Sequence, residues 1–232
     1  MNPNPSAVTR TRQILEDLEA VRENLLALSD DIWFSIDHND PESLEAGVEF
    51  KRAYNTKAAA FDAVASELST LVQQYTGARL GQEEQTGATN REQNERIVAE
   101  LNRDEPHRLD EDFTYKRPYG FILDGQATAG VTTWQRMYEL VCRQLFARDQ
   151  DRFRRLSEHT DFISNRGHHM VTTDATSLRK ALAVEGGVFV EANLSANGIR
   201  DVVRQLLAAF DLPIDRVQIF LRQDRDAERE VA

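Results

Sequence analysis

Asp124 and Glu191 stand at the ends of predicted strands, and they are the best candidates for metal chemistry in this sequence. A metal-dependent nuclease of the restriction type holds a divalent ion with one acid at a strand start and an acid–x–lysine pair on the next strand. The only acid–x–lysine spelling, Glu49-Phe50-Lys51, falls inside a helical heptad pattern. Asp124 and Glu191 therefore offer at most a degenerate site without its lysine, and a metal-dependent nuclease is the weakest of three functional hypotheses.

The other reactive residue types do not form a site either. His168 and His169 are adjacent, so on a strand they face opposite sides and cannot chelate one metal together. Cys142, the single cysteine, lies on the apolar face of a predicted helix, which favours packing over nucleophilic catalysis. Gly186-Gly187 precedes a strand and lacks the lysine of a nucleotide-binding loop. The sequence thus predicts no catalytic residue, no metal and no cofactor.

One group of arginines could contact nucleic acid, because neutralising phosphates releases counterions. Within the segment 136–155, three acids (Glu139, Asp149 and Asp151) reduce the net charge to +3, and internal ion pairing would reduce it further. A nucleic-acid-binding accessory protein is the second hypothesis. The candidate residues are Arg136, Arg143, Arg148, Arg152, Arg154 and Arg155.

The N-terminal part reads as two long helices. Apolar residues recur with alternating spacings of four and three from Ile14 to Ile32, which is a heptad seam. A second seam runs from Leu44 to Tyr75 and is interrupted at Lys51. Between them, Asp40 can cap the second helix and Pro41 suits its first position, while Gly77 suits a C-cap. The short turn predicts an antiparallel, coiled-coil-like hairpin over residues 1–77.

Two helices alone bury too little apolar surface to be stable. The hairpin therefore either packs on the rest of its own chain or associates with a second copy or a partner protein, and the width of its stripes favours association. The residues expected at that interface are Ile14, Leu18, Val21, Leu25, Leu28, Ile32, Trp33, Phe61, Leu68 and Val72.

Residues 78–112 are polar and glycine-bearing and predict a linker, with a short helix from Arg91 to Leu101. Residues 113–222 predict a small α+β domain with one sheet and helices on one face, so the fold class is α+β. Its first strand, Tyr119–Leu123, meets a tight turn at Asp124-Gly125, and a second strand returns over Thr128–Thr132. Residues 223–232 predict a charged, frayed tail.

Asn193, Ser195 and Asn197 lie at a predicted strand-to-helix turn, where Asn193 and Ser195 can bond to nearby backbone and cap the following helix. The stretch 191–197 (EANLSAN), together with RPYGFILDG at 117–125 and VQIFLR at 217–222, resembles an uncharacterised C-terminal domain of bacterial proteins from restriction or phage-defence neighbourhoods. That resemblance covers about residues 115–222. It implies genomic context and shape, and no functional residues can be transferred from it.

Charge and composition limit the partners. The net charge is −11, and residues 1–112 contribute −12 of it against +1 for the rest, so the first half should repel DNA and anionic membranes. The sequence lacks a run of roughly 20 apolar residues and predicts a cytoplasmic protein. The leading hypothesis is a non-enzymatic assembly protein of a bacterial defence or restriction system, which oligomerises or docks on a partner of the same operon.

Overall fold

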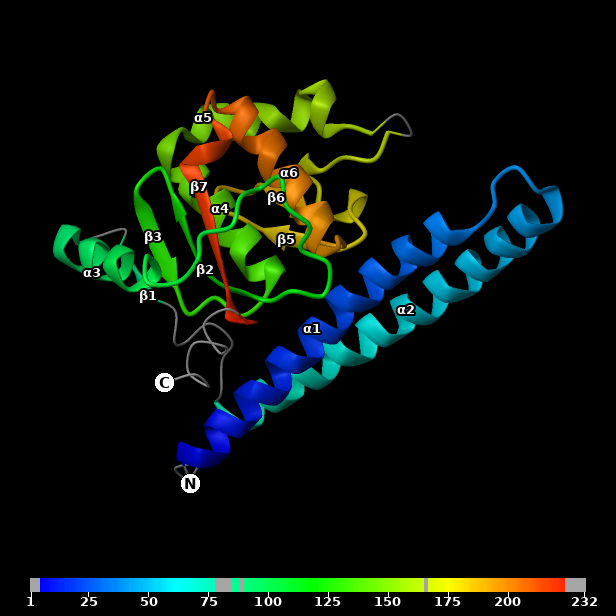
Figure 1. Cartoon of the computed structure of the whole chain (residues 1–232), viewed down its shortest axis with the longest axis horizontal. Coiled ribbons are helices and arrows are strands. Elements are labelled where there is room, and N and C mark those ends of the chain that lie inside the picture. Colours follow the sequence, from blue (N-terminus) through cyan, green and yellow to red (C-terminus); the bar gives the residue numbers. More distant parts are fainter. Residues whose placement is uncertain (1–4, 78–84, 88–89, 165–166, 224–232) are drawn as a thin grey trace. The chain divides into compact units, whose positions relative to one another are not determined.

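The computed structural model describes residues 5–77, 85–87, 90–164 and 167–223. The chain divides into two compact units, Met1–Gln82 and Glu83–Ala232. Two long helices form the first unit, and antiparallel sheets with helices form the second, which confirms the α+β class (Figure 1).

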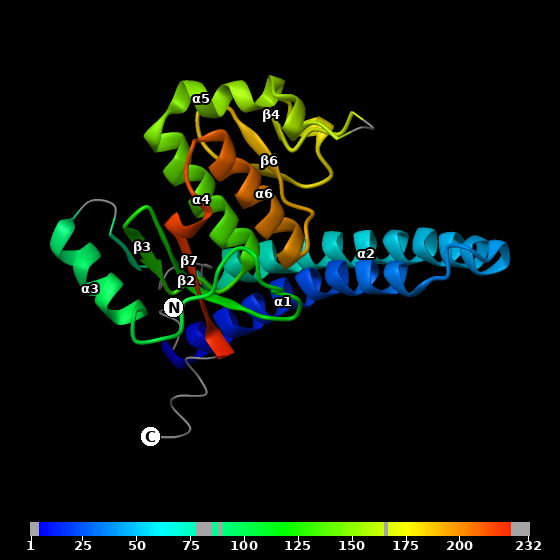
Figure 2. The ribbon, with the colours of Figure 1, turned by 45° about the horizontal axis from the view of Figure 1, so that its top comes forward.

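The first unit is an antiparallel hairpin of α1 (Pro5–Ser35) and α2 (Pro41–Thr76) (Figures 1 and 2). The predicted end signals are confirmed. The Asp40 side chain accepts a hydrogen bond from the Ser43 N–H, and Pro41 is the first residue of α2. Gly77 adopts φ 68° and donates its N–H to the Gln73 carbonyl, a conformation that glycine takes without strain.

Polar contacts join the two helices. Tyr54 donates its hydroxyl to the Leu25 carbonyl at 2.8 Å, and Lys51 Nζ donates to the Ser29 carbonyl at 2.7 Å. Arg22 lies 3.4 Å from the Asp62 carboxylate, and Ser29 is 3.4 Å from Asn55 Oδ1. Lys51 breaks the predicted seam of α2 because it bridges to α1 at this point.

The second unit is built on a four-stranded antiparallel sheet in the order β1-β3-β2-β7. Its strands are β1 (Gln85–Thr86), β2 (Pro118–Leu123), β3 (Gln126–Ala129) and β7 (Val217–Leu221). Asp124 and Gly125 form the predicted tight turn, with φ of 48° and 84°. The return strand was predicted over 128–132 and instead begins at Gln126, directly after this two-residue turn, and stops before Gly130, whose φ is 78°.

A second sheet was not predicted. Strands β4 (Val171–Thr172), β6 (Phe189–Glu191) and β5 (Ala181–Ala183) pair antiparallel in the order β4-β6-β5. The expectation of one sheet was wrong because β4 and β5 have only two and three residues, too few to show an alternating pattern.

Helices cover both faces of the four-stranded sheet, and not one face as expected (Figure 2). Phe121 and Ile219 point into a large core with α4 (Trp134–Arg148) and α6 (Ala196–Ala209), while α5 (Gln150–Arg155) follows α4. Ile122 and Phe220, one residue further along each strand, point to the other face and pack on α3 (Arg91–Leu101). The alternation of side chains along a strand produces this division.

Residues 85–112 belong to the second unit, so most of the predicted linker is folded structure. The helix expected at Arg91–Leu101 is α3, and its Ile97 and Leu101 are buried. Leu109 is fully buried in the large core. The expectation of a linker missed this because isolated anchors in a polar segment give no periodic signal. Residues 78–84 and 88–89 of that linker, and residues 224–232 of the predicted tail, lie outside the described residues.

Candidate functional site

Most of the candidate arginines form ion pairs within the second unit. Arg136 and Arg143 both contact Glu139, at 2.6 and 2.7 Å. Arg148 pairs with Asp124, and Arg154 lies 3.4 Å from Asp151. These pairs reduce the positive charge available to phosphates, although pairs at the surface are weak.

Arg152 has a structural role at the end of α6. Its Nε donates to the Ala209 carbonyl at 2.6 Å, and its Nη2 lies 2.6 Å from Asp211. The guanidinium also lies 5.4 Å from the centre of the Phe210 ring. A cation near the last carbonyls of a helix is stabilised by the helix dipole, so Arg152 holds α5 against the end of α6. Nucleic-acid binding by these arginines stays a prediction.

The two candidate acids lie in different sheets and are engaged in structural contacts. Glu191 accepts three backbone N–H groups, from Arg179 at 2.9 Å, Lys180 at 3.1 Å and Asn193 at 2.8 Å. It thereby fixes the segment before β5. Asp124 follows β2 and pairs with Arg148. Among the described residues, no group of three or more His, Cys, Asp or Glu side chains is placed to hold a metal ion.

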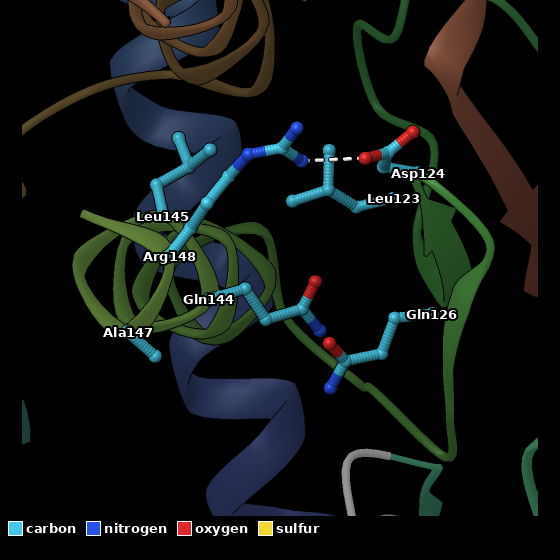
Figure 3. Close-up of a pocket in the computed structure, with 7 residues that line it drawn as sticks. All are labelled: Leu123, Asp124, Gln126, Gln144, Leu145, Ala147 and Arg148. Atoms are coloured by element: carbon cyan, nitrogen blue, oxygen red, sulfur yellow. Dashed lines mark hydrogen bonds and ion pairs between the residues drawn. The ribbon is translucent and has the colours of Figure 1, made fainter. Parts of the chain in front are cut away.

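A hollow of about 350 Å³ lies between the β2–β3 turn and the last turn of α4 (Figure 3). The Arg148 side chain reaches across it toward Asp124, and Gln144 and Gln126 point toward each other below this pair. Within the part of the chain that the structure describes, the buried Oε1 of Gln144 has no hydrogen-bond partner. Arg148 and Asp124 already neutralise each other, so beyond this pair the polar side chains that line the hollow are the amides of Gln126 and Gln144.

Cys142 is completely buried in the large core, as the sequence predicts. Burial raises the pKa of its thiol, which therefore stays protonated at neutral pH. Burial also raises the pKa of the Tyr138 hydroxyl, which lies beside it. Neither group is suited to act as a nucleophile or base in this environment.

A second hollow, of about 750 Å³, holds serine, histidine and aspartate side chains, the types used in nucleophilic catalysis. Their contacts are local, however. His159 Nδ1 accepts the backbone N–H of Asp161 at 3.3 Å, and the Ser164 hydroxyl accepts the N–H of His168 at 3.0 Å. These side chains stabilise the turns that carry them, and no motif in the sequence singles them out.

The three predicted turn residues have different roles. Ser195 caps α6 as expected, accepting the Gly198 N–H at 3.2 Å. Asn197, predicted as a turn residue, reaches a segment more than 80 residues earlier: its Oδ1 accepts the Phe113 N–H at 2.9 Å, and its Nδ2 donates to Asp112 at 2.7 Å. Among the described residues, the Asn193 side chain makes no hydrogen bond, so its expected local bond is not found.

Hydrogen bonds from Thr114 and Asn197 lower the pKa of Asp112 to about 2. Asp112 is exposed and ends the acidic run Asp110-Glu111-Asp112. Its carboxylate accepts the hydroxyl of Thr114 at 2.6 Å, in addition to the Asn197 amide. The acidic run therefore attaches residues 111–114 to the start of α6, and this attachment is structural.

The exposed side of α2 carries a continuous apolar stripe. Its positions follow one another at spacings of four or three residues, all are exposed, and Lys57 is the single charged member. The large ones among them are 45–90% exposed. We call this the α2 stripe, and it consists of Ala46, Phe50, Ala53, Lys57, Ala60, Val64, Leu68, Leu71 and Tyr75.

A shorter stripe on α1 consists of Ile14, Val21 and Leu28, which are spaced by seven residues and are 62%, 45% and 38% exposed. Successive residues are rotated by about 100° around a helix axis. Around the α1 axis, the α1 stripe lies about 70° from the residues that contact α2; around the α2 axis, the α2 stripe lies about 135° from the residues that contact α1. Both rotations are in the same sense relative to the chain direction, and because the helices run antiparallel, both stripes lie on the same side of the hairpin. The two stripes together form one surface, which we call the apolar face.

The predicted interface residues divide between this face and the rest of the hairpin. Ile14, Val21, Leu28 and Leu68 are exposed on the face. The others are half-buried in the chain: Leu18, Leu25, Ile32, Trp33, Phe61 and Val72. The seam predicted for the second helix runs through Tyr54 and Ala58 and shares few residues with the α2 stripe. Most of the stripe residues stand one position earlier in the sequence, with the same spacing of four and three. The role of all these residues in an interface stays a prediction.

Comparison with known proteins adds no assignment. No family model, no curated protein and no solved structure matches this chain. The resemblance of residues 115–222 to a defence-associated domain therefore stays a prediction. None of the helices in the described ranges is both long and apolar enough to cross a membrane.

Proposed function

We propose that this chain is a non-enzymatic assembly protein, whose hairpin docks on another protein surface through the apolar face. One observation carries the proposal: all nine positions of the α2 stripe are exposed and eight are apolar. A sustained heptad spacing is what a helix needs to pack against further helices. An exposed apolar patch of this extent marks an interaction site in a folded protein.

The contacts inside the hairpin support this proposal. The helices are joined by polar bonds such as Tyr54 to Leu25 and Lys51 to Ser29, while large apolar side chains remain outside. Each such polar bond contributes only about 0.5–1.5 kcal/mol. Burying the apolar face against a partner would supply stability that these bonds do not.

Photo-crosslinking in living cells tests the proposal on the full chain. A photoreactive residue introduced as Val64→p-benzoylphenylalanine lies on the face, and irradiation is expected to give a discrete band of higher mass. The matched control is Ala63→p-benzoylphenylalanine, because Ala63 is also exposed and apolar but points about 100° away. If position 64 gives no band beyond that of position 63, the apolar face binds no protein and the proposal is overturned.

The alternative is a nucleic-acid-binding accessory protein, and its surface is less favourable. Arg136, Arg143, Arg148, Arg152 and Arg154 each lie within ion-pair distance of a carboxylate. We therefore expect no DNA shift at low salt. A shift that disappears when Arg152, Arg154 and Arg155 are changed to glutamate would favour this alternative.

The cellular setting belongs to the same proposal. We place the protein in the cytoplasm on its single cysteine and its lack of a long apolar run. We propose that it is an accessory of a bacterial defence or restriction system on the resemblance of residues 115–222 alone. Its gene neighbourhood is the direct test, since neighbouring restriction or defence genes would support the setting and a chromosomal context without them would contradict it.

A further inference from the structure

The two stripes of the apolar face share one centre. The α1 stripe is centred on Val21, and the α2 stripe, from Ala46 to Tyr75, is centred between Ala60 and Phe61. The cross-helix contacts fix how the helices align, since the two residue numbers of each contact add to between 79 and 84. This alignment places Val21 level with Phe61. Both stripes are therefore centred at the same height along the hairpin.

The α2 stripe is also complementary to itself in size. Its first half is mostly small, with Ala46, Ala53 and Ala60, and its second half is large, with Val64, Leu68, Leu71 and Tyr75. When the stripe is rotated by 180° about its centre, Ala46 meets Tyr75 and Ala53 meets Leu68, whereas Phe50 meets Leu71. On α1 the same rotation brings Ile14 opposite Leu28. Small side chains meeting large ones allow two helices to pack closely.

We propose that a second copy of this chain occupies the apolar face, related by a two-fold axis that crosses the hairpin at the height of Val21 and Ala60. The α2 helices of the two copies form the central antiparallel pair, with the α1 stripes beside them, and the result is a four-helix bundle. This inference rests on the proposed function and names its partner. A two-fold interface uses the same patch on both subunits, which is the property that the common centre provides.

The single charge on the stripe agrees with this arrangement. Turning the stripe about its centre places Lys57 beside Val64 of the other copy, one helical turn from the exposed Glu67 of that copy. In a parallel arrangement, Lys57 would face Lys57 of the other copy, and like charges would repel. Lys57 therefore favours the antiparallel orientation, as a polar residue in a coiled-coil seam favours one register.

The available area is sufficient for a stable dimer. The stripe spans 29 residue steps, or about 44 Å, and a hairpin is roughly 20 Å wide, since each helix is about 10–12 Å across. The face therefore covers up to about 880 Å² per copy. This matches the roughly 800 Å² that each partner buries in a specific interface of standard size.

Engineered disulfides in the full chain test the inference, against the background of the buried Cys142. Ala60→Cys lies next to the axis, and we expect it to link to itself under mild oxidation. Ala53→Cys should not, because its two copies lie about 22 Å apart. An equimolar mixture of Ala53→Cys and Leu68→Cys should give the mixed dimer. Ala63→Cys, which points away from the face, is the control for random collision.

Each outcome decides. Self-linking of Ala53→Cys with no mixed product would show a parallel pair, and absence of all three links would show that no second copy binds here; either result overturns the inference. The photo-crosslink at position 64 separates this failure from that of the proposed function. A band at a mass other than twice the chain would leave the proposed function standing with a different partner, whereas no band would remove both.

Discussion

The two units differ in where their apolar side chains lie: buried in the second unit and largely exposed in the hairpin. In the second unit, Phe121, Trp134 and Ile219 are almost completely buried in a core that the chain supplies itself. In the hairpin, Leu71 is 64% and Tyr75 is 90% exposed, and polar bonds join the helices. The second unit therefore buries its apolar side chains within itself, whereas the hairpin presents apolar surface that a partner can cover.

The largest expected effect comes from the core of the second unit. Phe121→Ala removes a fully buried ring and leaves a cavity, which costs about 3–5 kcal/mol of unfolding free energy. Urea unfolding followed by Trp134 fluorescence, in a Trp33→Phe background, measures this cost. Leu71→Ala on the apolar face should change the same transition by less than about 0.5 kcal/mol. Equal effects of the two changes would remove the distinction between the units.

A smaller effect is expected where residues 111–114 attach to α6. Asn197→Ala removes the bonds to the Phe113 N–H and to Asp112 and leaves a buried donor unpaired, at a cost of about 1–3 kcal/mol. The matched control is Asn193→Ala, since that side chain makes no hydrogen bond within the described part of the chain, and it should cost less than about 0.5 kcal/mol. Thermal unfolding of both variants compares them, and a larger loss for Asn193→Ala would contradict the assignment.

The smallest effect concerns pH. The pKa of Asp112 falls from 3.8 to about 2 in the folded protein, so ionised Asp112 stabilises the folded state. Its contribution to the free energy of unfolding is complete above pH 4–5 and is lost as the pH falls toward 2. Because Asp112 is exposed to solvent, the contribution should stay below about 1 kcal/mol. Urea titrations at pH 6 and pH 2.5 should show a smaller pH dependence for Asp112→Ala than for the wild type. An unchanged pH dependence would mean that Asp112 does not contribute.

Features set by neighbouring residues could be predicted from the sequence. Asp40 and Ser195 cap their helices, and Asp124-Gly125 forms the tight turn, because each depends on a few consecutive residues. The reach of Asn197 to Phe113 could not be predicted, because it joins residues far apart in the chain. Similarly, Leu109 enters the core as an isolated anchor with no periodic pattern around it.

The candidate site divides in the same way. The heptad spacing predicted that the hairpin has apolar stripes and named Ile14 and Leu68 among the interface residues. Only the fold shows that these two are exposed, whereas others in the same set, such as Leu18, are half-buried. α2 carries two adjacent seams, the one through Tyr54 and the α2 stripe, and the bonds of Lys51 and Tyr54 with α1 determine which of them faces solvent. The spacing of apolar residues does not distinguish them, since both seams have the same spacing.

The mass of the full chain in solution, measured by light scattering, tests most directly that the apolar face holds a second copy. The wild type is expected at twice the 26.4 kDa of one chain. The double variant Leu68→Glu with Leu71→Glu places charges on the large half of the α2 stripe and should give the single-chain mass with unchanged helix content. A wild type that remains at 26.4 kDa at high concentration, or a double variant that still forms the dimer, would contradict assembly through this face.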